Sequence, residues 1–324
     1  MTRLPPARSA ETSAGTIAFL DEGHGPPVLL LHGFPLWSWQ WREYVPLLAA
    51  RFRVIAPDLP GAGRSVPAEH VALDLTTQAA GVRELLAGLD IERFAVVAHG
   101  AGAGVAQLLA LGGDGVDAMV LLDAATLDAW PSGGVASARA RIESEGATPE
   151  LVRSLVHGAI DAGALRRDRL IDDVVDAYAD PYATGTGPAR FVRVLEGLDG
   201  FGLAGREAEL GAIEAPVLIL WGEDDPVYPA GVGERLNEAM PSSTLGLLPG
   251  CGHFLPDEAA ETIGPMIVEY LRARYAHAPH GHGDPNAGIV MLQLERRPPW
   301  LDLEEDERDD WFHDDDDDEE ARGP

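Results

Sequence analysis

Lysine is absent from this sequence, so all 24 of its basic residues are arginine. They stand against 53 acidic residues, which gives a formal net charge of −29 at pH 7. A surface this acidic repels phosphate backbones and anionic lipid head groups. We therefore expect neither a nucleic-acid partner nor a membrane-surface role.

Cysteine and long apolar runs are nearly as scarce. Cys251 is the one cysteine in the chain, which excludes an internal disulfide and is typical of a reducing cytosol. The first residues, MTRLPPARSAETSAG, lack the apolar core of a secretory signal, and no apolar run approaches the length of a membrane span. These absences predict a cytoplasmic protein.

The sequence does contain short apolar runs that alternate with helical patterns. Runs such as VLLL, AVVA and VLIL are apolar throughout, as strands covered on both faces are. Strand and helix in alternation predict a mostly parallel sheet with helices on both faces. The expected strands are Thr16–Asp21, Val28–His32, Arg53–Pro57, Phe94–Ala98, Ala118–Leu122, Val217–Trp221 and Thr244–Leu248. The expected helices are Leu73–Leu89, Gly102–Leu111, Gly231–Met240 and Ala259–Tyr275.

Three stretches depart from this alternation of strands and helices. Residues 127–211 are helix-prone with no convincing strand, and we expect them to form a helical cap over the carboxyl ends of the strands. The domain then ends near residue 275. Residues 276–297 are expected to be a linker with one short apolar segment, GIVMLQL, and residues 298–324 a disordered acidic tail.

The tail holds 14 acidic and 2 basic residues, with aromatic residues among them. Such a segment can dock on a basic protein partner, and a purely solubilising role stays an alternative. His277, His280 and His282 suggest a metal tract, but no carboxylate or cysteine spacing completes it, so we interpret them as part of a His-rich linker. We expect no metal and no cofactor.

Five segments fall at the carboxyl ends of predicted strands, where a parallel sheet places its site. They are HGFP at 32–35, DLPGAGRS at 58–65, AHGAGAG at 98–104, WGEDDPVYP at 221–229 and GCGHFLP at 250–256. Taken in this order, over roughly residues 15–275, they resemble the α/β-hydrolase fold family. The resemblance implies that family's mostly parallel sheet with a helical cap.

The resemblance also implies the roles of four residues. Asp225 takes the position of the catalytic acid and His253 that of the base. The backbone N–H groups of Phe34 and Ala101 take the positions that hold a developing oxyanion. An Asp–His pair fixes the imidazole tautomer and stabilises the imidazolium, which suits general base catalysis near neutral pH.

The nucleophile of the family is missing. The pattern small-x-nucleophile-x-Gly is met by Ala98 to Gly102, with Gly100 in the nucleophile position. Cys251 lies too close to His253 in the chain to replace it, and Ser65 ends a turn whose family role is structural. HGFPLWSWQW and VAQLLAL are more similar to the epoxide-hydrolase and dehalogenase-like branch, whose nucleophile is Asp. An ancestor with a Ser nucleophile stays open.

A pocket lined by apolar and aromatic residues is expected over this site, and it suits a small hydrophobic substrate. The candidates for its lining are Trp37, His99, Trp130, Tyr178 and Tyr182. Helix packing is the alternative for the two tyrosines.

Three interpretations of function follow. The first is an enzyme of the hydrolase type that lacks the covalent step and performs direct hydrolysis or lyase, isomerase or cofactor-free oxygenase chemistry. The second is a non-catalytic protein that binds a ligand or a partner in the retained pocket. The third is a hydrolase inactivated deliberately at Gly100. We favour the first.

Overall fold

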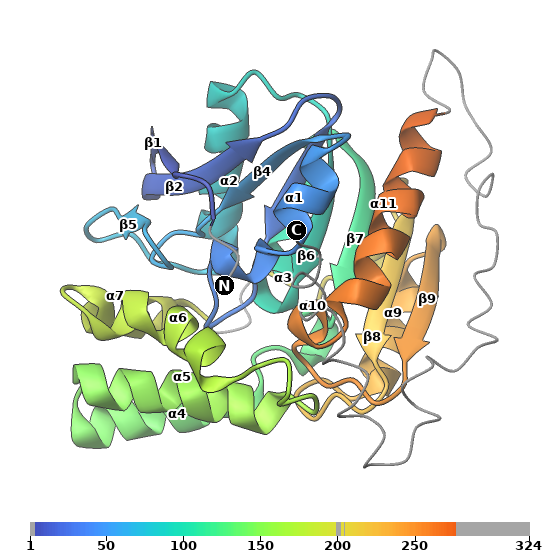
Figure 1. Ribbon diagram of the computed structural model, residues 1–324. Helices are drawn as coiled ribbons and strands as arrows, with labels where there is room; N and C mark the ends of the chain where they lie inside the picture. Colours follow the sequence, from blue (N-terminus) through green and yellow to red (C-terminus); the bar gives the residue numbers. More distant parts are fainter. Residues whose placement is uncertain (1–3, 199–201, 204, 277–324) are drawn as a thin grey trace, which may run out of the picture. The chain divides into compact units, whose positions relative to one another are not determined.

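The computed structural model describes residues 4–198, 202–203 and 205–276 (Figure 1). Its strands form one sheet in the order β1-β2-β4-β3-β6-β7-β8-β9, with β5 paired to β2. The strands are β1 (Arg8–Thr12), β2 (Gly15–Glu22), β3 (Pro27–Leu31), β4 (Arg53–Pro57), β5 (Val66–Pro67), β6 (Phe94–His99), β7 (Val116–Leu122), β8 (Val217–Gly222) and β9 (Ser243–Leu248).

The sheet is parallel from β4 to β9 and antiparallel at its first edge. β3 pairs in parallel with β4 and β6, and the series continues through β7, β8 and β9. β2 is antiparallel to β1, β4 and β5. All seven predicted strands are confirmed within one or two residues. β1 and β5 were not predicted, because the half-exposed RSAET and the two-residue VP have no apolar run.

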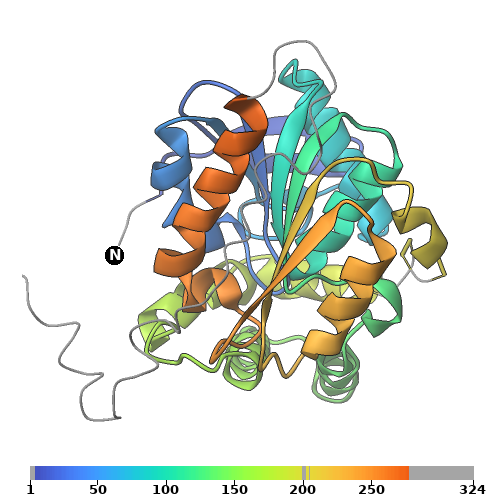
Figure 2. The same cartoon turned by 90° about the vertical axis from the view of Figure 1, so that its right-hand side faces the viewer.

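Helices cover both faces of the sheet. α1 (Tyr44–Ala49) and α11 (Ala260–Ala276) pack together on one face, and α2 (Leu75–Gly88) packs with α3 (Gly100–Leu111) on the other (Figures 1 and 2). α9 (Ala230–Ala239) follows β8, and α10 (Leu255–Glu258) precedes α11. The four predicted helices correspond to α2, α3, α9 and α11, while the short α1 and α10 were not predicted.

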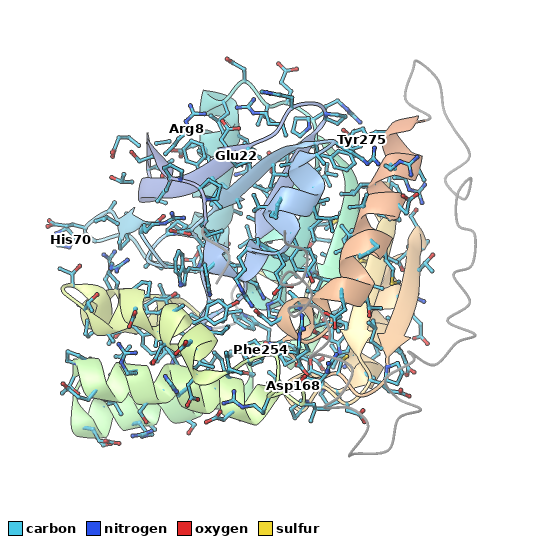
Figure 3. All side chains as sticks on the ribbon, in the orientation of Figure 1. Arg8, Glu22, His70, Asp168, Phe254 and Tyr275 are labelled. Carbon is cyan, nitrogen blue, oxygen red and sulfur yellow. The ribbon has the colours of Figure 1, made fainter. Side chains whose placement is uncertain are left out.

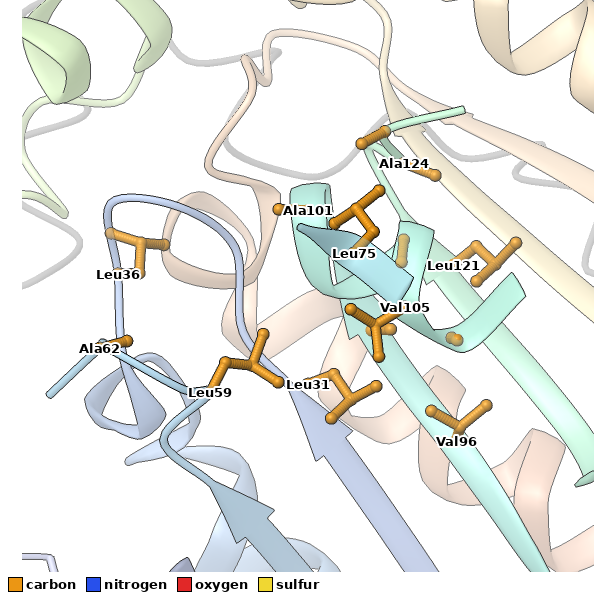
Figure 4. Packing of buried hydrophobic residues seen from close by; sticks show 14 of the residues in the cluster. Leu31, Leu36, Leu59, Ala62, Leu75, Val96, Ala101, Val105, Leu121 and Ala124 are labelled. Carbon is orange, nitrogen blue, oxygen red and sulfur yellow. The ribbon is translucent and has the colours of Figure 1, made fainter. Parts of the chain in front are cut away.

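The core lies between the strands and these helices. Leu31, Val96 and Leu121 come from three neighbouring strands and are fully buried, with Val105 of α3 packed near them (Figure 4). Burial of one such side chain stabilises the fold by about 1.5–3 kcal/mol. The all-apolar strand runs therefore reflect contact on both faces.

Residues 127–210 contain helices and no strand among those that the structure describes. We call α4 (Gly133–Glu145), α5 (Pro149–Gly163), α6 (Asp172–Ala183) and α7 (Gly187–Gly197) the insertion helices. The short η2 (Leu127–Ala129) precedes them and α8 (Glu207–Leu210) follows. In Figure 1 the arrowheads of β8 and β9 point toward the insertion helices, so these helices lie past the carboxyl ends of the strands.

Two further expectations concern the ends of the chain and the membrane. The acidic tail and all of the predicted linker beyond Ala276 lie outside the described residues. Among the helices that the structure describes, none is long and apolar enough to cross a bilayer.

Candidate active site

β6 passes into α3 without a loop, and Gly100 stands at the tip of this turn. Its φ of +51° lies in the left-handed region that side chains disfavour. A Cβ placed on Gly100 would lie 3.5 Å from Gly33 Cα and 3.8 Å from His253 Nε2, both ordinary contacts. The turn therefore keeps the shape that presents a side chain to His253, although it carries none.

The predicted acid and base are in contact. Asp225, in the loop after β8, accepts a hydrogen bond from His253 Nδ1 through Oδ2 at 2.9 Å. Its other oxygen accepts the N–H groups of Val227 at 2.7 Å and Tyr228 at 3.0 Å. Asp225 thus places the imidazole proton on Nδ1, and Nε2 is left to accept a proton. The neighbouring Asp224 turns away and accepts the Gly250 N–H at 3.3 Å.

His99 lies beneath the tip rather than in front of it. Its Nε2 donates to the His253 carbonyl at 2.8 Å, and its Nδ1 accepts from the Gln40 side-chain amide at 2.9 Å. The Gln40 amide oxygen accepts the Gly33 N–H at 3.2 Å, which joins the first motif to the base loop. Complete burial lowers the pKa of His99 well below its usual 6.5, so the ring is neutral.

One group of potential metal ligands occurs among the described residues. Atoms of His99, Asp123 and His253 lie within 4.8 Å of one another. Both nitrogens of His99 and both oxygens of Asp123 already hold hydrogen bonds. A bound ion would have to break them, so the arrangement does not favour a metal.

The two predicted oxyanion donors border the same space. Within the described part of the chain, neither the Phe34 N–H nor the Ala101 N–H has an acceptor. Both residues line a cavity of about 490 Å³ that reaches His253. Unpaired N–H groups beside a free imidazole nitrogen can stabilise a negative charge that forms next to the base.

The walls of the cavity come from the sheet end and from the insertion helices. Trp130, Phe191 and Leu195 contribute apolar surface, and Tyr228 and Phe254 flank the base. Figure 3 shows Phe254 between the sheet and the insertion helices. A cavity of this kind binds a mainly apolar small molecule.

A comparison with family models matches residues 26–260 to the α/β hydrolase fold. The chain belongs to the α/β-hydrolase fold family.

Relatives of this chain carry different names. A magnesium-chelatase 30 kDa subunit of Rhodobacter capsulatus is 31% identical over 76% of this chain and 87% of its own length. Haloalkane dehalogenase 2 of Mycobacterium tuberculosis is 27% identical over 81% of this chain and 94% of its own length. A 2-hydroxy-6-oxononadienedioate/2-hydroxy-6-oxononatrienedioate hydrolase of Paraburkholderia xenovorans is 30% identical over 78% and 89%. This chain is also similar to the solved structure of a meta-cleavage product hydrolase from Pseudomonas fluorescens, an S103A mutant with acetates. The TM-score is 0.70 and the identity 25%, and the match covers 82% of this chain and 97% of the other.

Four of the five residues predicted to line the pocket of this α/β hydrolase do not line the cavity, and only Trp130 does. Hydrogen bonds hold Trp37 and His99 away from the cavity. The Trp37 Nε1 donates to the Ala177 carbonyl at 2.9 Å. The insertion helices turn their tyrosines toward the protein body instead of the cavity. The Tyr178 hydroxyl donates to Asp257 at 2.9 Å, and the Tyr182 hydroxyl donates to the Leu36 carbonyl at 3.1 Å. Helix packing, the alternative for these tyrosines, is what the structure shows.

Two buried carboxylates that the sequence interpretation missed hold the base loop. Glu258 accepts N–H groups on both sides of His253, from Gly252 at 3.0 Å and Phe254 at 3.1 Å. Asp123, at the end of β7, accepts the Gly222 N–H at 2.8 Å and the Leu255 N–H, beside the base, at 3.3 Å. Burial raises the pKa of both carboxyls, with the Asp225 charge as the second cause for Asp123. The LLD sequence that ends β7 was a usable signal for Asp123, since it also places an acid at a strand end.

Tyr228 is the other residue that was missed. Its ring is 2% exposed, lines the cavity and meets the His253 ring edge-on, with 5.1 Å between the centroids. Its position three residues after Asp225 could have indicated this contact, because the acid loop must pass beside the base.

Proposed function

We propose that this α/β-hydrolase family member is an enzyme in which His253, oriented by Asp225, acts as a general base without a covalent intermediate. The observation that supports this proposal is that His253 Nε2 faces the position at Gly100, where no side chain is present. A glycine cannot form an ester with a substrate. The space beside it can take a water molecule or a deeper part of the substrate, next to the nitrogen that accepts a proton.

The chemistry needs three elements. Nε2 removes a proton from water or from an acidic C–H, N–H or O–H of the substrate, and Asp225 stabilises the imidazolium that results. The negative charge that develops on a substrate oxygen is held by the Phe34 and Ala101 N–H groups. The products are those of direct hydrolysis, or of a lyase, isomerase or cofactor-free oxygenation step that begins with proton removal.

The substrate is small and mainly hydrophobic, in keeping with the walls of the cavity. The similarity to a haloalkane dehalogenase supports the placement near the dehalogenase-like branch. The similarity to that enzyme and to a hydrolase of dienedioate compounds supports the choice of hydrolysis as the first reaction to assay.

The test is turnover by the wild type and by His253→Ala. The assay panel holds haloalkanes, epoxides, carboxylic esters and 2-hydroxy-6-oxo-dienoates. We expect His253→Ala to lower kcat about 100- to 10,000-fold, the usual contribution of a general base. The matched control is His157→Ala, since His157 lies on α5 and contacts Asp176 at 3.0 Å, outside the cavity.

Unchanged turnover in His253→Ala would contradict the proposal. A wild type that binds panel compounds but converts none would favour the non-catalytic interpretation, which the missing side chain at Gly100 also motivates.

A further inference from the structure

The cavity continues away from His253 into a slot between α4 and α5. Gly134, Ala138 and Arg141 line it from α4, at spacings that put them on one face of the helix. Leu155, Gly158 and Ala162 line it from α5 in the same manner. Gly134, Ala138, Gly158 and Ala162 thus give both helices small side chains where they border the cavity.

This slot has room that ordinary side chains would fill. A Cβ on Gly133 or Gly158 would meet no atom within 4 Å, and one on Gly134 would meet only Ser132 Oγ at 3.7 Å. All three glycines line the cavity and are exposed, so the cavity is open to solvent at this part of the slot. The slot is therefore long enough for a ligand to extend well beyond the reach of His253. Gly134 and Arg141 are separated by ~10 Å along the helix at 1.5 Å per residue.

Arg141 stands at the end of this slot and is the one lysine- or arginine-type cation among the described residues that line the cavity. Ser137 and Ser154 line the same end and offer hydroxyl groups. The partner of Arg141 is Glu145, one turn along α4, at 3.0 Å, and both side chains are about half exposed. Such a pair in water is weak, so a ligand carboxylate can compete for the guanidinium.

We propose that the cavity binds an elongated amphipathic ligand, with its apolar body between α4 and α5 and a carboxylate at Arg141. The reaction of the ligand at its opposite end rests on the proposed function. The binding of its apolar body and of its carboxylate does not depend on that function. The selection of an anion by a chain of net charge −29 requires a local cation, and Arg141 supplies it.

The experiment is calorimetric titration of the full chain with decanoate and, separately, with decanol, which has the same apolar body and no charge. We expect the wild type to bind decanoate more tightly than decanol. In Arg141→Gln the affinity for decanoate should fall about tenfold and that for decanol should not change, since only one charge-assisted contact is lost. Arg141→Lys should lie between the two.

Two further variants locate the ligand. Gly158→Leu should weaken both probes, because its side chain fills the slot. Arg206→Gln removes a partly exposed arginine that is paired with Glu209 outside the cavity, and it should change neither affinity.

Equal affinities of the wild type for decanoate and decanol, equal losses of both in Arg141→Gln, or no binding of either probe would overturn the inference. His253→Ala should bind decanoate like the wild type. The proposed function can therefore fail in the turnover assay while this inference stands. Likewise, this inference can fail in the titrations while the proposed function stands.

Discussion

Gly100 is the residue on which the chemistry of this site depends. Its surroundings accept a side chain, and its φ of +51° costs a residue other than glycine about 1–2 kcal/mol. We expect Gly100→Asp and Gly100→Ser to lower the free energy of unfolding by about that amount in urea titrations. Because the new carboxylate or hydroxyl would face His253 Nε2, one of them should gain hydrolysis, the former of haloalkanes and the latter of esters.

Gly102 provides the matched control for this prediction. A Cβ at Gly102 would lie 2.5 Å from the carbonyl oxygens of Leu31 and His32, closer than real contacts allow. Gly102→Ala should therefore destabilise the protein more than Gly100→Ser. The opposite order would show that the turn does not have room for a nucleophile.

His99 and His32 make the stability depend on pH. Burial lowers the pKa of both rings below 6.5, so the folded protein binds their protons more weakly than the unfolded chain does. The free energy of unfolding should fall as the pH drops below 6.5, by up to about 1.4 kcal/mol per pH unit for each ring. The raised pKa values of Asp123 and Glu258 act in the other direction, since they lower stability as the pH rises above the ordinary carboxyl range.

A comparison of the wild type with one variant isolates the contribution of the His99 ring to this pH dependence. His99→Gln removes one titrating ring and leaves the carboxyls, so its unfolding free energy should depend less steeply on pH than that of the wild type between pH 7 and about pH 5. Parallel curves for the two proteins would contradict the assignment of a neutral, buried His99.

At the scale of elements, a buried polar cluster ties the insertion helices to the protein body. Arg42, which follows η1 (Ser38–Trp41), donates to Asp257 of α10 at 2.7 Å and to the Tyr178 hydroxyl of α6 at 3.1 Å. All three side chains are buried. Asp257→Leu leaves the buried Arg42 charge with only the more distant Glu43, at 3.5 Å, and we expect it to lower the free energy of unfolding by about 3–5 kcal/mol.

An exposed ion pair is the control for this cluster. Arg235 and Asp128 are in contact at 2.7 Å with half or more of each side chain exposed. Asp128→Leu should leave the urea midpoint nearly unchanged, because such pairs contribute little in water. A loss in Asp257→Leu no larger than this would mean that the buried cluster does not anchor α6.

The difference between local sequence patterns and contacts with distant residues explains what the sequence could predict. The strands and the turn around Gly100 follow from local apolar runs and glycine spacing. The pairing of Asp225 with His253 is what the resemblance to the α/β-hydrolase fold family implies, and strand ends that meet at one edge of a parallel sheet are consistent with it. The orientation of an inserted helix depends on contacts with distant residues instead. The spacing of Tyr178 and Tyr182 indicates one face of α6, but only Asp257 and the Leu36 carbonyl, far away in the chain, determine that this face points to the body.

At the scale of the whole molecule, the imbalance of charge governs the response to salt. A net charge of −29 repels itself across the folded surface, and the Debye length falls from about 10 Å at 0.1 M salt to about 3 Å at 1 M. We expect the Tm measured by circular dichroism to rise as NaCl increases over this range, and to rise equally in KCl because screening does not depend on the cation. Removal of residues 298–324 takes away a net charge of −12, which leaves −17, so the rise should be shallower in the shortened chain. A Tm that falls with salt would instead mean that attraction within exposed pairs such as Arg153 with Asp176 and Asp180 exceeds the repulsion.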